Sequence, residues 1–117
     1  MILVDDDLAY RRSLRAFLDA SHDVRVVADT GDGREAIELV AELRPDAVIV
    51  DLAMPGIDGV EVASALMTAV PETAVLLVTG ADDGPERRRA SELGPPLIHK
   101  GDPLPIENAL RALTRRR

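Results

Sequence analysis

Aspartates follow two short apolar runs of the sequence. Asp5, Asp6 and Asp7 come directly after the first run, and Asp51 follows Ala47–Val50. Carboxylates held within roughly 5 Å of one another repel by about 3 kcal/mol per pair at an effective dielectric constant near 20. Such a cluster is therefore expected to bind a cation or to hold a proton. Because the candidate ligands are all oxygens, with no His or Cys among them, a hard cation such as Mg²⁺ suits the site.

Two later apolar runs end in a hydroxyl and an ammonium group. Thr79-Gly80 follows Ala74–Val78, and Lys100 follows Leu97–His99. Lys100 is the one lysine in a chain that otherwise carries only arginine, so its compact, flexible positive charge is a candidate functional group. Carboxylates, a hydroxyl and an ammonium at one edge of a sheet indicate a site that handles phosphoryl groups.

Each of these residues also has a purely structural interpretation. Asp7 is expected to cap the helix that follows it, and Asp51 could be a turn residue ahead of Met54-Pro55-Gly56. A threonine after a strand is often a β-former or a local cap, and a lysine there is often only solvated. The functional interpretation of Asp51, Thr79 and Lys100 therefore depends on the elements that bring them together.

Five β-branched runs alternate with five stretches of helical periodicity. The predicted strands are Ile2–Val4, Val24–Ala28, Ala47–Val50, Ala74–Val78 and Leu97–His99. The predicted helices are Leu8–Ala20, Arg34–Leu43, Val60–Val70, Glu86–Leu93 and Ile106–Arg115. The helix starts are marked by Asp32-x-x-Glu35 and Asp58-x-x-Glu61, which resemble capping boxes, and by prolines at first-turn positions, Pro85 and Pro103. Strict alternation predicts a doubly wound parallel α/β sheet with helices on both faces.

The order of the strands follows from which runs are least apolar. The second run contains Arg25, and the fifth is short and follows Pro95-Pro96, so both are expected at the edges of the sheet. This favours a five-stranded, flavodoxin-like sheet of order 2-1-3-4-5. In such sheets ligands bind at the carboxyl ends of the strands, at the point between strands one and three where the order reverses. Asp5, Asp6 and Asp51 flank that point.

Length and composition limit the classes of protein that the chain can belong to. Its 117 residues suffice for one compact domain, which we expect to span residues 1–117, either complete or as the N-terminal part of a longer regulator. The net charge of −7 offers no basic field to nucleic acid, and 2% aromatic residues exclude a surface of stacked aromatics. The charge is uneven, since residues 1–84 carry −11 and residues 85–117 carry +4. The absence of cysteine, of a long apolar run and of a signal-peptide pattern favours the cytoplasm.

The motifs together resemble those of the receiver domain of bacterial two-component response regulators, similar to the chemotaxis receivers, over nearly the whole chain. They are Ile-Leu-Val-Asp5-Asp6, Val-Ile-Val-Asp51-Leu-Ala-Met-Pro55-Gly56-Ile-Asp58-Gly59, Leu-Leu-Val-Thr79-Gly80 and Lys100 after the last strand. The resemblance implies that Asp51 accepts a phosphoryl group from a histidine kinase as an acyl phosphate. It also implies that Mg²⁺ is held by Asp5, Asp6, Asp51 and the backbone carbonyl of Ala53. The domain would then be a phosphorylated switch more than an enzyme.

The remaining site residues and the output also follow from this resemblance. Lys100 and the Thr79 hydroxyl would bind phosphoryl oxygens, and Gly80 would let its N–H approach the phosphate. Movement of Thr79 and of the loop Gly80–Gly84 would bias the fourth helix and fifth strand, with Arg87-Arg88-Arg89 on the readout face. The implied partners are a histidine kinase, an output domain or protein that acts in transcription regulation, and a second copy of the chain. No direct contact of this domain with nucleic acid or membrane is expected.

The sequence departs from the family pattern on the output side. Leu97 stands where an aromatic residue commonly precedes the lysine, Gly101 stands where a proline often follows it, and Gly80 stands where alanine is usual. The approach to the fifth strand, residues 92–96, also differs. Coupling through a rotating aromatic side chain is therefore not expected in this chain.

Two other functions remain open from the sequence. The chain could keep the receiver fold as an interaction module that works without phosphorylation. Alternatively, Gly31-Asp32-Gly33-x-x-Ala36 follows a strand and opens a helix, with Asp51 twenty residues after Gly31, and so matches a dinucleotide-binding fingerprint. That match would make the chain part of an oxidoreductase, although Asp32 would face the pyrophosphate.

Overall fold

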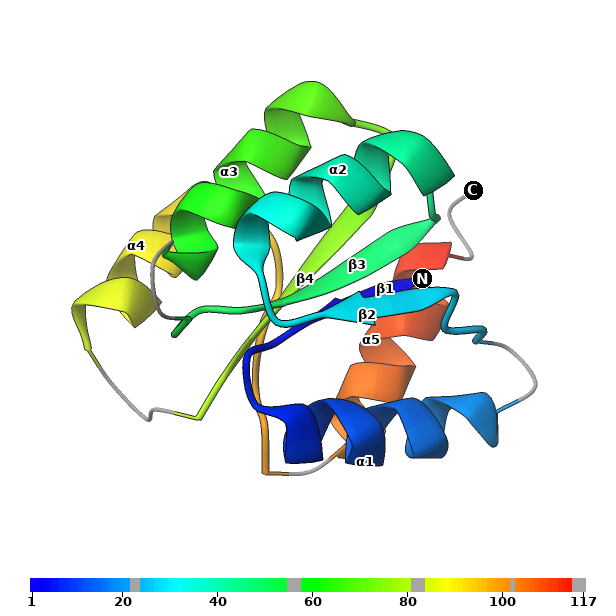
Figure 1. Ribbon diagram of the computed structural model, residues 1–117. Helices are drawn as coiled ribbons and strands as arrows, with labels where there is room; N and C mark the ends of the chain where they lie inside the picture. The colour runs from blue at the N-terminus through cyan, green and yellow to red at the C-terminus, as the bar shows by residue number, and fades with distance from the viewer. Residues whose placement is uncertain (22–23, 55–57, 81–83, 102, 115–117) are drawn as a thin grey trace.

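A computed structural model of the chain describes residues 1–21, 24–54, 58–80, 84–101 and 103–114, and strands alternate with helices throughout this part (Figure 1). The strands are β1 (Ile2–Val4), β2 (Ala28–Thr30), β3 (Ala47–Asp51), β4 (Ala74–Thr79) and β5 (Leu97–His99). The helices are α1 (Leu8–Asp19), α2 (Gly33–Leu43), α3 (Gly59–Ala69), α4 (Pro85–Leu93) and α5 (Pro103–Thr114). All strands pair in parallel in the order β2-β1-β3-β4-β5, so the predicted fold class and strand order are confirmed.

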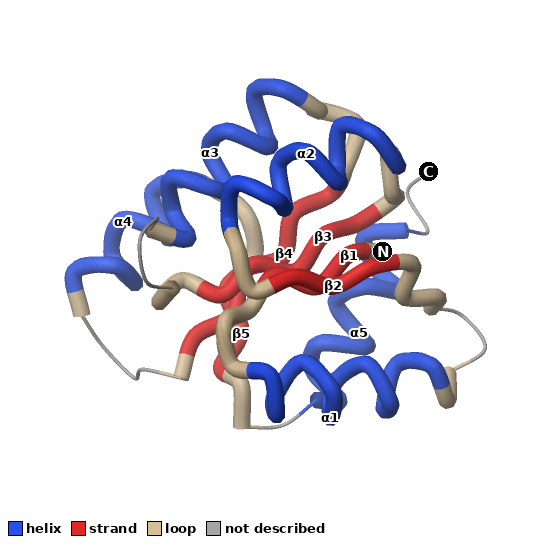
Figure 2. The backbone as a smooth tube through the Cα atoms, in the orientation of Figure 1, coloured by secondary structure: helices blue, strands red, loops and turns tan. Residues whose placement is uncertain are grey.

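The sheet lies between two layers of helices, with α2, α3 and α4 on one face and α1 and α5 on the other (Figure 2). Successive side chains of a strand point to opposite faces, so each strand contributes to two separate cores. Ile2, Val4, Val48 and Val50 pack in one core, whereas Leu3, Ile49, Leu76 and Val78 pack in the other. Burial on both faces explains why the central strands are continuously apolar. None of the described helices is long and apolar enough to cross a bilayer.

The second strand lies later in the sequence than predicted. We predicted a strand over Val24–Ala28, but β2 begins at Ala28 and ends at Thr30. The register explains the difference, because Ala28 lies opposite Ile2, the first residue of β1, and residues 24–27 precede the ladder. Val26 is buried in the core beneath, and the N–H of Val27 donates to the carbonyl oxygen of Met1 at 2.9 Å, so the apolar run lies alongside the start of β1 without being part of the strand ladder.

Three aspartates cap helices at the predicted positions. The Oδ1 atom of Asp7 accepts a hydrogen bond from the backbone N–H of Tyr10 at 3.1 Å. Asp32 and Asp58 accept corresponding bonds at the starts of α2 and α3, at 2.9 and 2.7 Å. Each bond satisfies an amide that the helix itself leaves unpaired. The predicted cap role of Asp7 is therefore confirmed.

Two helices begin at prolines. Pro85 is the first residue of α4, and Pro103 is the first residue of α5. Proline suits this position because its missing N–H would have no partner there and its backbone angle is already helical. Helix α5 consequently begins three residues before the predicted start at Ile106, and the predicted end at Arg115 lies outside the described residues.

Helix α3 begins very close to the end of β3. The backbone N–H of Gly59 donates to the carbonyl oxygen of Leu52 at 3.1 Å. A Cβ atom at Gly59 would overlap the carbonyl oxygen of Asp51 and would lie 2.6 Å from the Cα of Leu52. Only a glycine lets the helix pack this closely against the segment that carries Asp51.

We therefore expect Gly59→Ala to destabilise the protein. The added methyl meets backbone atoms that cannot move aside, and overpacking of this kind costs about 1–3 kcal/mol of unfolding free energy. Chemical denaturation measures the loss. Gly80→Ala is the matched control, since an added Cβ there meets no atom of the described residues within 4 Å and is expected to change stability by less than about 1 kcal/mol. Equal stabilities of the two variants would contradict the prediction.

Candidate functional site

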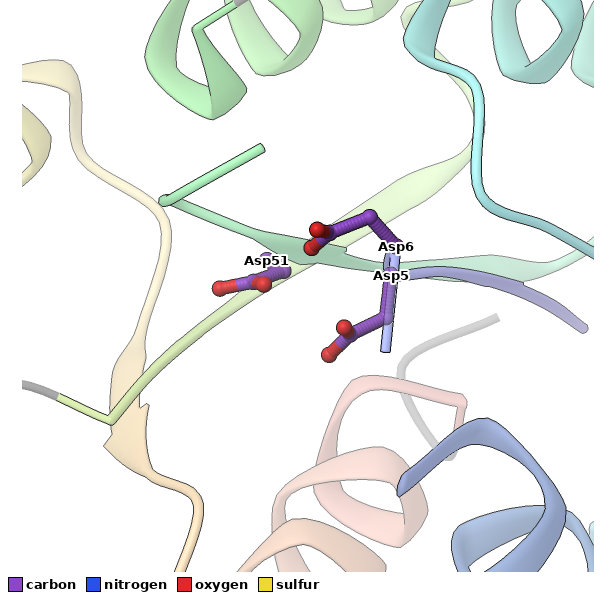
Figure 3. A group of neighbouring side chains, drawn as sticks. All are labelled: Asp5, Asp6 and Asp51. Carbon is purple, nitrogen blue, oxygen red and sulfur yellow. The ribbon is translucent and has the colours of Figure 1, made fainter. Parts of the chain in front are cut away.

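The aspartates predicted to form a site lie together at the carboxyl ends of β1 and β3. The two strands are neighbours, with Val4 opposite Val50, so Asp5 and Asp51 leave the sheet side by side. Figure 3 shows the carboxyl groups of Asp5, Asp6 and Asp51 gathered beyond the strand ends and pointing to the same side. One oxygen from each lies within 4.8 Å of the others. Asp5 and Asp51 are buried, whereas Asp6 is exposed.

The carboxylate of Asp5 is fixed through one oxygen, and its other oxygen faces the ammonium of Lys100. Its Oδ1 atom accepts a hydrogen bond from the backbone N–H of Asp7 at 2.9 Å. Its Oδ2 atom is buried and accepts no hydrogen bond from the described residues. The ammonium of Lys100 lies 2.6 Å from Oδ2 and forms an ion pair with it. A buried oxygen held in this way is suited to a cation.

Lys100 brings its charge into the centre of the acidic cluster. It follows β5, and its backbone N–H donates to the carbonyl oxygen of Thr79 at 2.9 Å, which fixes the lysine at the same edge of the sheet. Its Nζ donates to Oδ2 of Asp51 at 3.0 Å. Burial opposes the charge of the ammonium, but the contacts with Asp5 and Asp51 outweigh it and raise the pKa of Lys100. The lysine therefore stays protonated.

The surroundings of Asp51 disfavour its ionised form. Burial raises the pKa of Asp51 from its ordinary value of 3.8 to about 6, and the charge of Asp5 acts in the same direction. The hydrogen bonds from Lys100 and from the backbone N–H of Ala53, at 3.2 Å, oppose the shift. One positive charge is thus insufficient to balance the acids around it.

The donor set fits a hard divalent cation. Three carboxylates face one ammonium, so two negative charges remain in excess, and the ligand atoms are all oxygen. In proteins Mg²⁺ is typically coordinated by a few carboxylates, with water and phosphate oxygens as its other ligands. The Mg²⁺ ligands expected from the sequence, Asp5, Asp6 and Asp51, are therefore brought together. The carbonyl of Ala53 remains a predicted fourth ligand.

The hydroxyl predicted for the site also lies at this edge. Thr79 is the last residue of β4, the strand next to β3, and it is buried. Gly80 follows it, and the space around an added Cβ is open among the described residues, so packing does not require glycine there. The predicted switch loop continues into residues 81–83, which lie outside the described residues, as does the Pro55-Gly56 part of the family motif.

Two further residues that the sequence did not single out support the site. The Nη1 atom of Arg11 donates to the backbone carbonyl of Asp5 at 2.8 Å, and its Nε donates to Asp29 at 3.0 Å. Arg11 therefore joins α1 and β2 to the loop that carries the acidic pair. The ring of Tyr10 lies over Lys100, with 4.5 Å between the ring centroid and Nζ. In the sequence, the signal that could have pointed to Tyr10 and Arg11 is their position in the first turn of the helix just after the three aspartates.

Replacement of Arg11 is expected to cost stability. Arg11→Gln removes the ion pair with Asp29 and the bond to the Asp5 carbonyl, both mostly shielded from water. Hydrogen bonds to charged groups contribute about 1.5–3 kcal/mol each, and Asp29 keeps its ion pair with Arg15, so we expect the free energy of unfolding to fall by about 1.5–3 kcal/mol in total. Arg12→Gln, the exposed neighbour on the same helix, should change stability by less than about 0.5 kcal/mol. A smaller loss for Arg11→Gln than for Arg12→Gln would refute this role.

One of the three arginines predicted on the readout face forms an ion pair with another helix. The Nη1 atom of Arg89 donates to Oδ2 of Asp58 at 2.6 Å, so α4 is joined to the cap of α3. Because the other carboxylate oxygen of Asp58 caps α3, this one side chain serves both helices. Arg88 is exposed and Arg87 is half-buried. Leu97, at the position where the resemblance implies an aromatic residue, is partly buried against one of the two cores.

The glycine-rich segment after β2 has a packing explanation. A Cβ at Gly31 would lie 2.6 Å from Nη1 of Arg11, so glycine leaves room for the guanidinium. Asp32 occupies the N-terminus of α2 with its own carboxylate, by its bond to the N–H of Arg34. The amide that a pyrophosphate would need is therefore already bonded, and the geometry does not favour a dinucleotide site.

Comparisons with known proteins agree with this geometry. The sequence model of one protein family, the response regulator receiver domain, matches residues 1–96 of this chain. Response regulator MprA of Mycolicibacterium vanbaalenii is 40% identical over 94 residues, which cover 80% of this chain and 40% of that protein. Transcriptional regulatory protein LiaR of Bacillus subtilis is 34% identical over 83 residues, 71% of this chain and 39% of that protein. The solved signal receiver domain of NarL from Mycobacterium tuberculosis has a TM-score of 0.89 at 30% identity and covers 99% of this chain and 95% of that one.

The matches cover most of this chain but only part of the curated relatives. The chain spans about two fifths of the length of the curated relatives that it matches. The family match includes Asp5, Asp6, Asp51 and Thr79 and ends before Lys100, which the fold nevertheless brings to the same edge of the sheet. The matched residues cover most of the chain, and the solved receiver domain superposes over nearly all of it. The chain therefore belongs to the response regulator receiver domain family.

Proposed function

We propose that Asp51 of this receiver domain accepts a phosphoryl group and that its modification switches the output of a two-component system. The observation that supports this role most strongly is the buried Asp51 carboxylate at the end of β3, 3.0 Å from Lys100 Nζ and next to Asp5 and Asp6. A nucleophile, a fixed positive charge and a cation site meet there. Related proteins that carry this domain are named as response regulators and transcriptional regulators.

The chemistry is the transfer of a phosphoryl group between two side chains. A carboxylate oxygen of Asp51 forms a bond to phosphorus while the phosphorus–nitrogen bond of a phosphohistidine donor breaks, and the imidazole leaves with the bonding electron pair. The product is an acyl phosphate on Asp51. Asp51 must be ionised to attack, and positive charge in the site favours that form because it counteracts the pKa raised by burial.

The neighbouring residues hold the charge that the transfer brings in. Asp5, Asp6, Asp51 and the carbonyl of Ala53 would hold Mg²⁺, which supplies positive charge to the phosphoryl oxygens. The ammonium of Lys100 would leave its two carboxylates and pair with a phosphoryl oxygen. The hydroxyl of Thr79 would donate to another, at the end of the neighbouring strand. These roles account for a lysine that the family pattern places after the last strand.

The proposed partners are those of the family. The phosphodonor is a histidine kinase, and the phosphorylated domain controls an output domain or protein, which for relatives such as LiaR acts in transcription. Phosphorylation adds about −1.5 to −2 charges at the sheet edge, and Thr79 and the region after it would carry that change to α4 and β5. The domain itself would neither bind nucleic acid nor turn over an external substrate. Dimerisation and a cytoplasmic location stay predictions.

The proposal is tested with a small acyl phosphate or phosphoramidate donor in the presence and absence of Mg²⁺. Intact-mass spectrometry should detect one added phosphoryl group in the wild type, only when Mg²⁺ is present, and none in Asp51→Asn. Equal incorporation in wild type and Asp51→Asn would contradict the assignment. The alternative, a receiver-like interaction module independent of phosphorylation, predicts no incorporation and no binding of a beryllium fluoride mimic in either protein.

A further inference from the structure

The aromatic ring of Tyr10 and the ammonium of Lys100 form a contact that joins α1 to the end of β5. The Nζ atom lies over the ring, 4.5 Å from its centroid. Both side chains also border one cavity of about 230 Å³ between α1 and the start of α5, together with Ser13, Leu14, Gly101 and Pro103. A cation over an aromatic face is attracted by the ring quadrupole, more strongly where water is excluded.

The ring, and not the hydroxyl, carries this contact. The hydroxyl oxygen of Tyr10 is buried and has no hydrogen-bond partner among the described residues. A buried hydroxyl without a partner contributes nothing favourable to the fold. Tyr10 is moreover the one tyrosine, and with Phe17 one of two aromatic residues in the chain. An aromatic ring is thus placed over the one lysine in a protein that has almost no aromatics.

The other contacts of Lys100 are with two carboxylates that are also candidate ligands of a cation. Its Nζ lies 2.6 Å from Asp5 and 3.0 Å from Asp51, the carboxylates suited to a divalent cation. When a cation satisfies those carboxylates, the ammonium loses much of their attraction and its four-carbon side chain becomes free to move. Among the described residues, no other cation lies over the ring of Tyr10. The ring therefore keeps its attraction for the ammonium when a cation binds the carboxylates.

We propose that Tyr10 is a positioning residue for Lys100, which keeps the ammonium beside Asp51 for the incoming phosphoryl group. The inference rests on the proposed phosphorylation of Asp51. Because the aromatic face of Tyr10 contacts the ammonium, phenylalanine at this position should position Lys100 as well as tyrosine does. A residue of similar bulk without a ring should not.

The kinetic test compares Tyr10→Phe and Tyr10→Leu at saturating Mg²⁺ with a small acyl phosphate donor. We expect Tyr10→Leu to be phosphorylated about 3- to 30-fold more slowly than wild type, and Tyr10→Phe to keep the wild-type rate. The affinity for Mg²⁺, measured by calorimetry, should be the same in all three proteins. Phe17→Leu is the matched control, because Phe17 lies on α1 and packs partly buried against the same core. Its rate should equal that of wild type.

A double-mutant cycle separates positioning from a general loss of packing. If Tyr10 acts through Lys100, then Tyr10→Leu has no further effect on the rate in a Lys100→Met background. A rate loss of equal size in both backgrounds would overturn the inference, as would a Tyr10→Phe variant as slow as Tyr10→Leu. A wild type that accepts no phosphoryl group would instead overturn the proposed function.

A spectroscopic test needs no phosphorylation. Lys100 is the one lysine, so the resonances of its ε-methylene protons can be assigned without ambiguity. A ring current should shift them upfield in the wild type, in Tyr10→Phe and in Phe17→Leu, with and without Mg²⁺, and the shift should be absent in Tyr10→Leu. Loss of the upfield shift in the Mg²⁺-loaded wild type would show that the ring releases the ammonium and would refute the proposal.

Discussion

In the absence of Mg²⁺, Asp51→Asn is expected to be more stable than the wild type at pH 7, by up to about 3 kcal/mol. Burial and the charge of Asp5 raise the pKa of Asp51 from 3.8 to about 6 in the folded protein. The folded state therefore binds the Asp51 proton more tightly than the unfolded state. The stabilisation is fully present below pH 3.8 and is lost as the pH rises through about 6. Asparagine resembles the neutral carboxyl and does not titrate, so it avoids this loss.

Urea unfolding of the two metal-free proteins between pH 4 and pH 7 measures the difference. The stabilities should agree near pH 4 and separate as the pH rises through about 6. Asp46→Asn, at the exposed position just before β3, is the control and should be no more stable than the wild type at pH 7, because the Asp46 carboxylate attracts the Met1 ammonium. Mg²⁺ should stabilise the wild type more than Asp51→Asn, because a ligand stabilises the state that binds it. An Asp51→Asn protein less stable than the wild type at pH 7 would show that Asp51 is a structural carboxylate.

Asp5→Asn is expected to weaken Mg²⁺ binding by about 100-fold or more. Asp5 offers a buried oxygen that lies 2.6 Å from the ammonium of Lys100, and the change removes the carboxylate charge while the shape is kept. One carboxylate charge within roughly 5 Å of a cation contributes about 3 kcal/mol per unit of cation charge at an effective dielectric constant near 20, or about 6 kcal/mol for Mg²⁺. Even half of that value corresponds to about two powers of ten in affinity.

Isothermal titration with MgCl₂ checks this value. Asp7→Asn is the matched control, because Asp7 stands two residues away and caps α1, a role in which asparagine is as good as aspartate. The control should keep its Mg²⁺ affinity within about twofold. An Asp5→Asn variant that binds Mg²⁺ as tightly as Asp7→Asn would place the cation elsewhere.

The architecture could be predicted because it depends on local patterns. Alternation of apolar runs with helical periodicity indicated the parallel sheet, and Arg25 and Pro95-Pro96 marked the edge strands. The carboxyl ends of neighbouring parallel strands must meet, so Asp5 and Asp51 could be placed together from the sequence. The bounds of β2 could not be predicted, because they depend on which residues lie opposite β1 and not on the apolar run itself.

The supporting residues of the site could not be predicted for a related reason. Tyr10 contacts Lys100, and Arg11 contacts Asp29, across helix–sheet interfaces whose geometry no local pattern specifies. The glycine at position 31 illustrates the same limit. It matched a dinucleotide fingerprint in the sequence, whereas in the fold it makes room for the side chain of Arg11.

The phosphoryl group is proposed to be on Asp51 and not on the acids beside it. The most direct measurement is reductive trapping of the phosphorylated, Mg²⁺-loaded wild type with a hydride reagent, which converts an acyl phosphate to the corresponding alcohol, followed by peptide mapping. We expect the alcohol at Asp51 alone. Recovery of the trapped product at Asp5 or Asp6, or of Asp51 entirely unmodified in a protein that has gained a phosphoryl group, would contradict it.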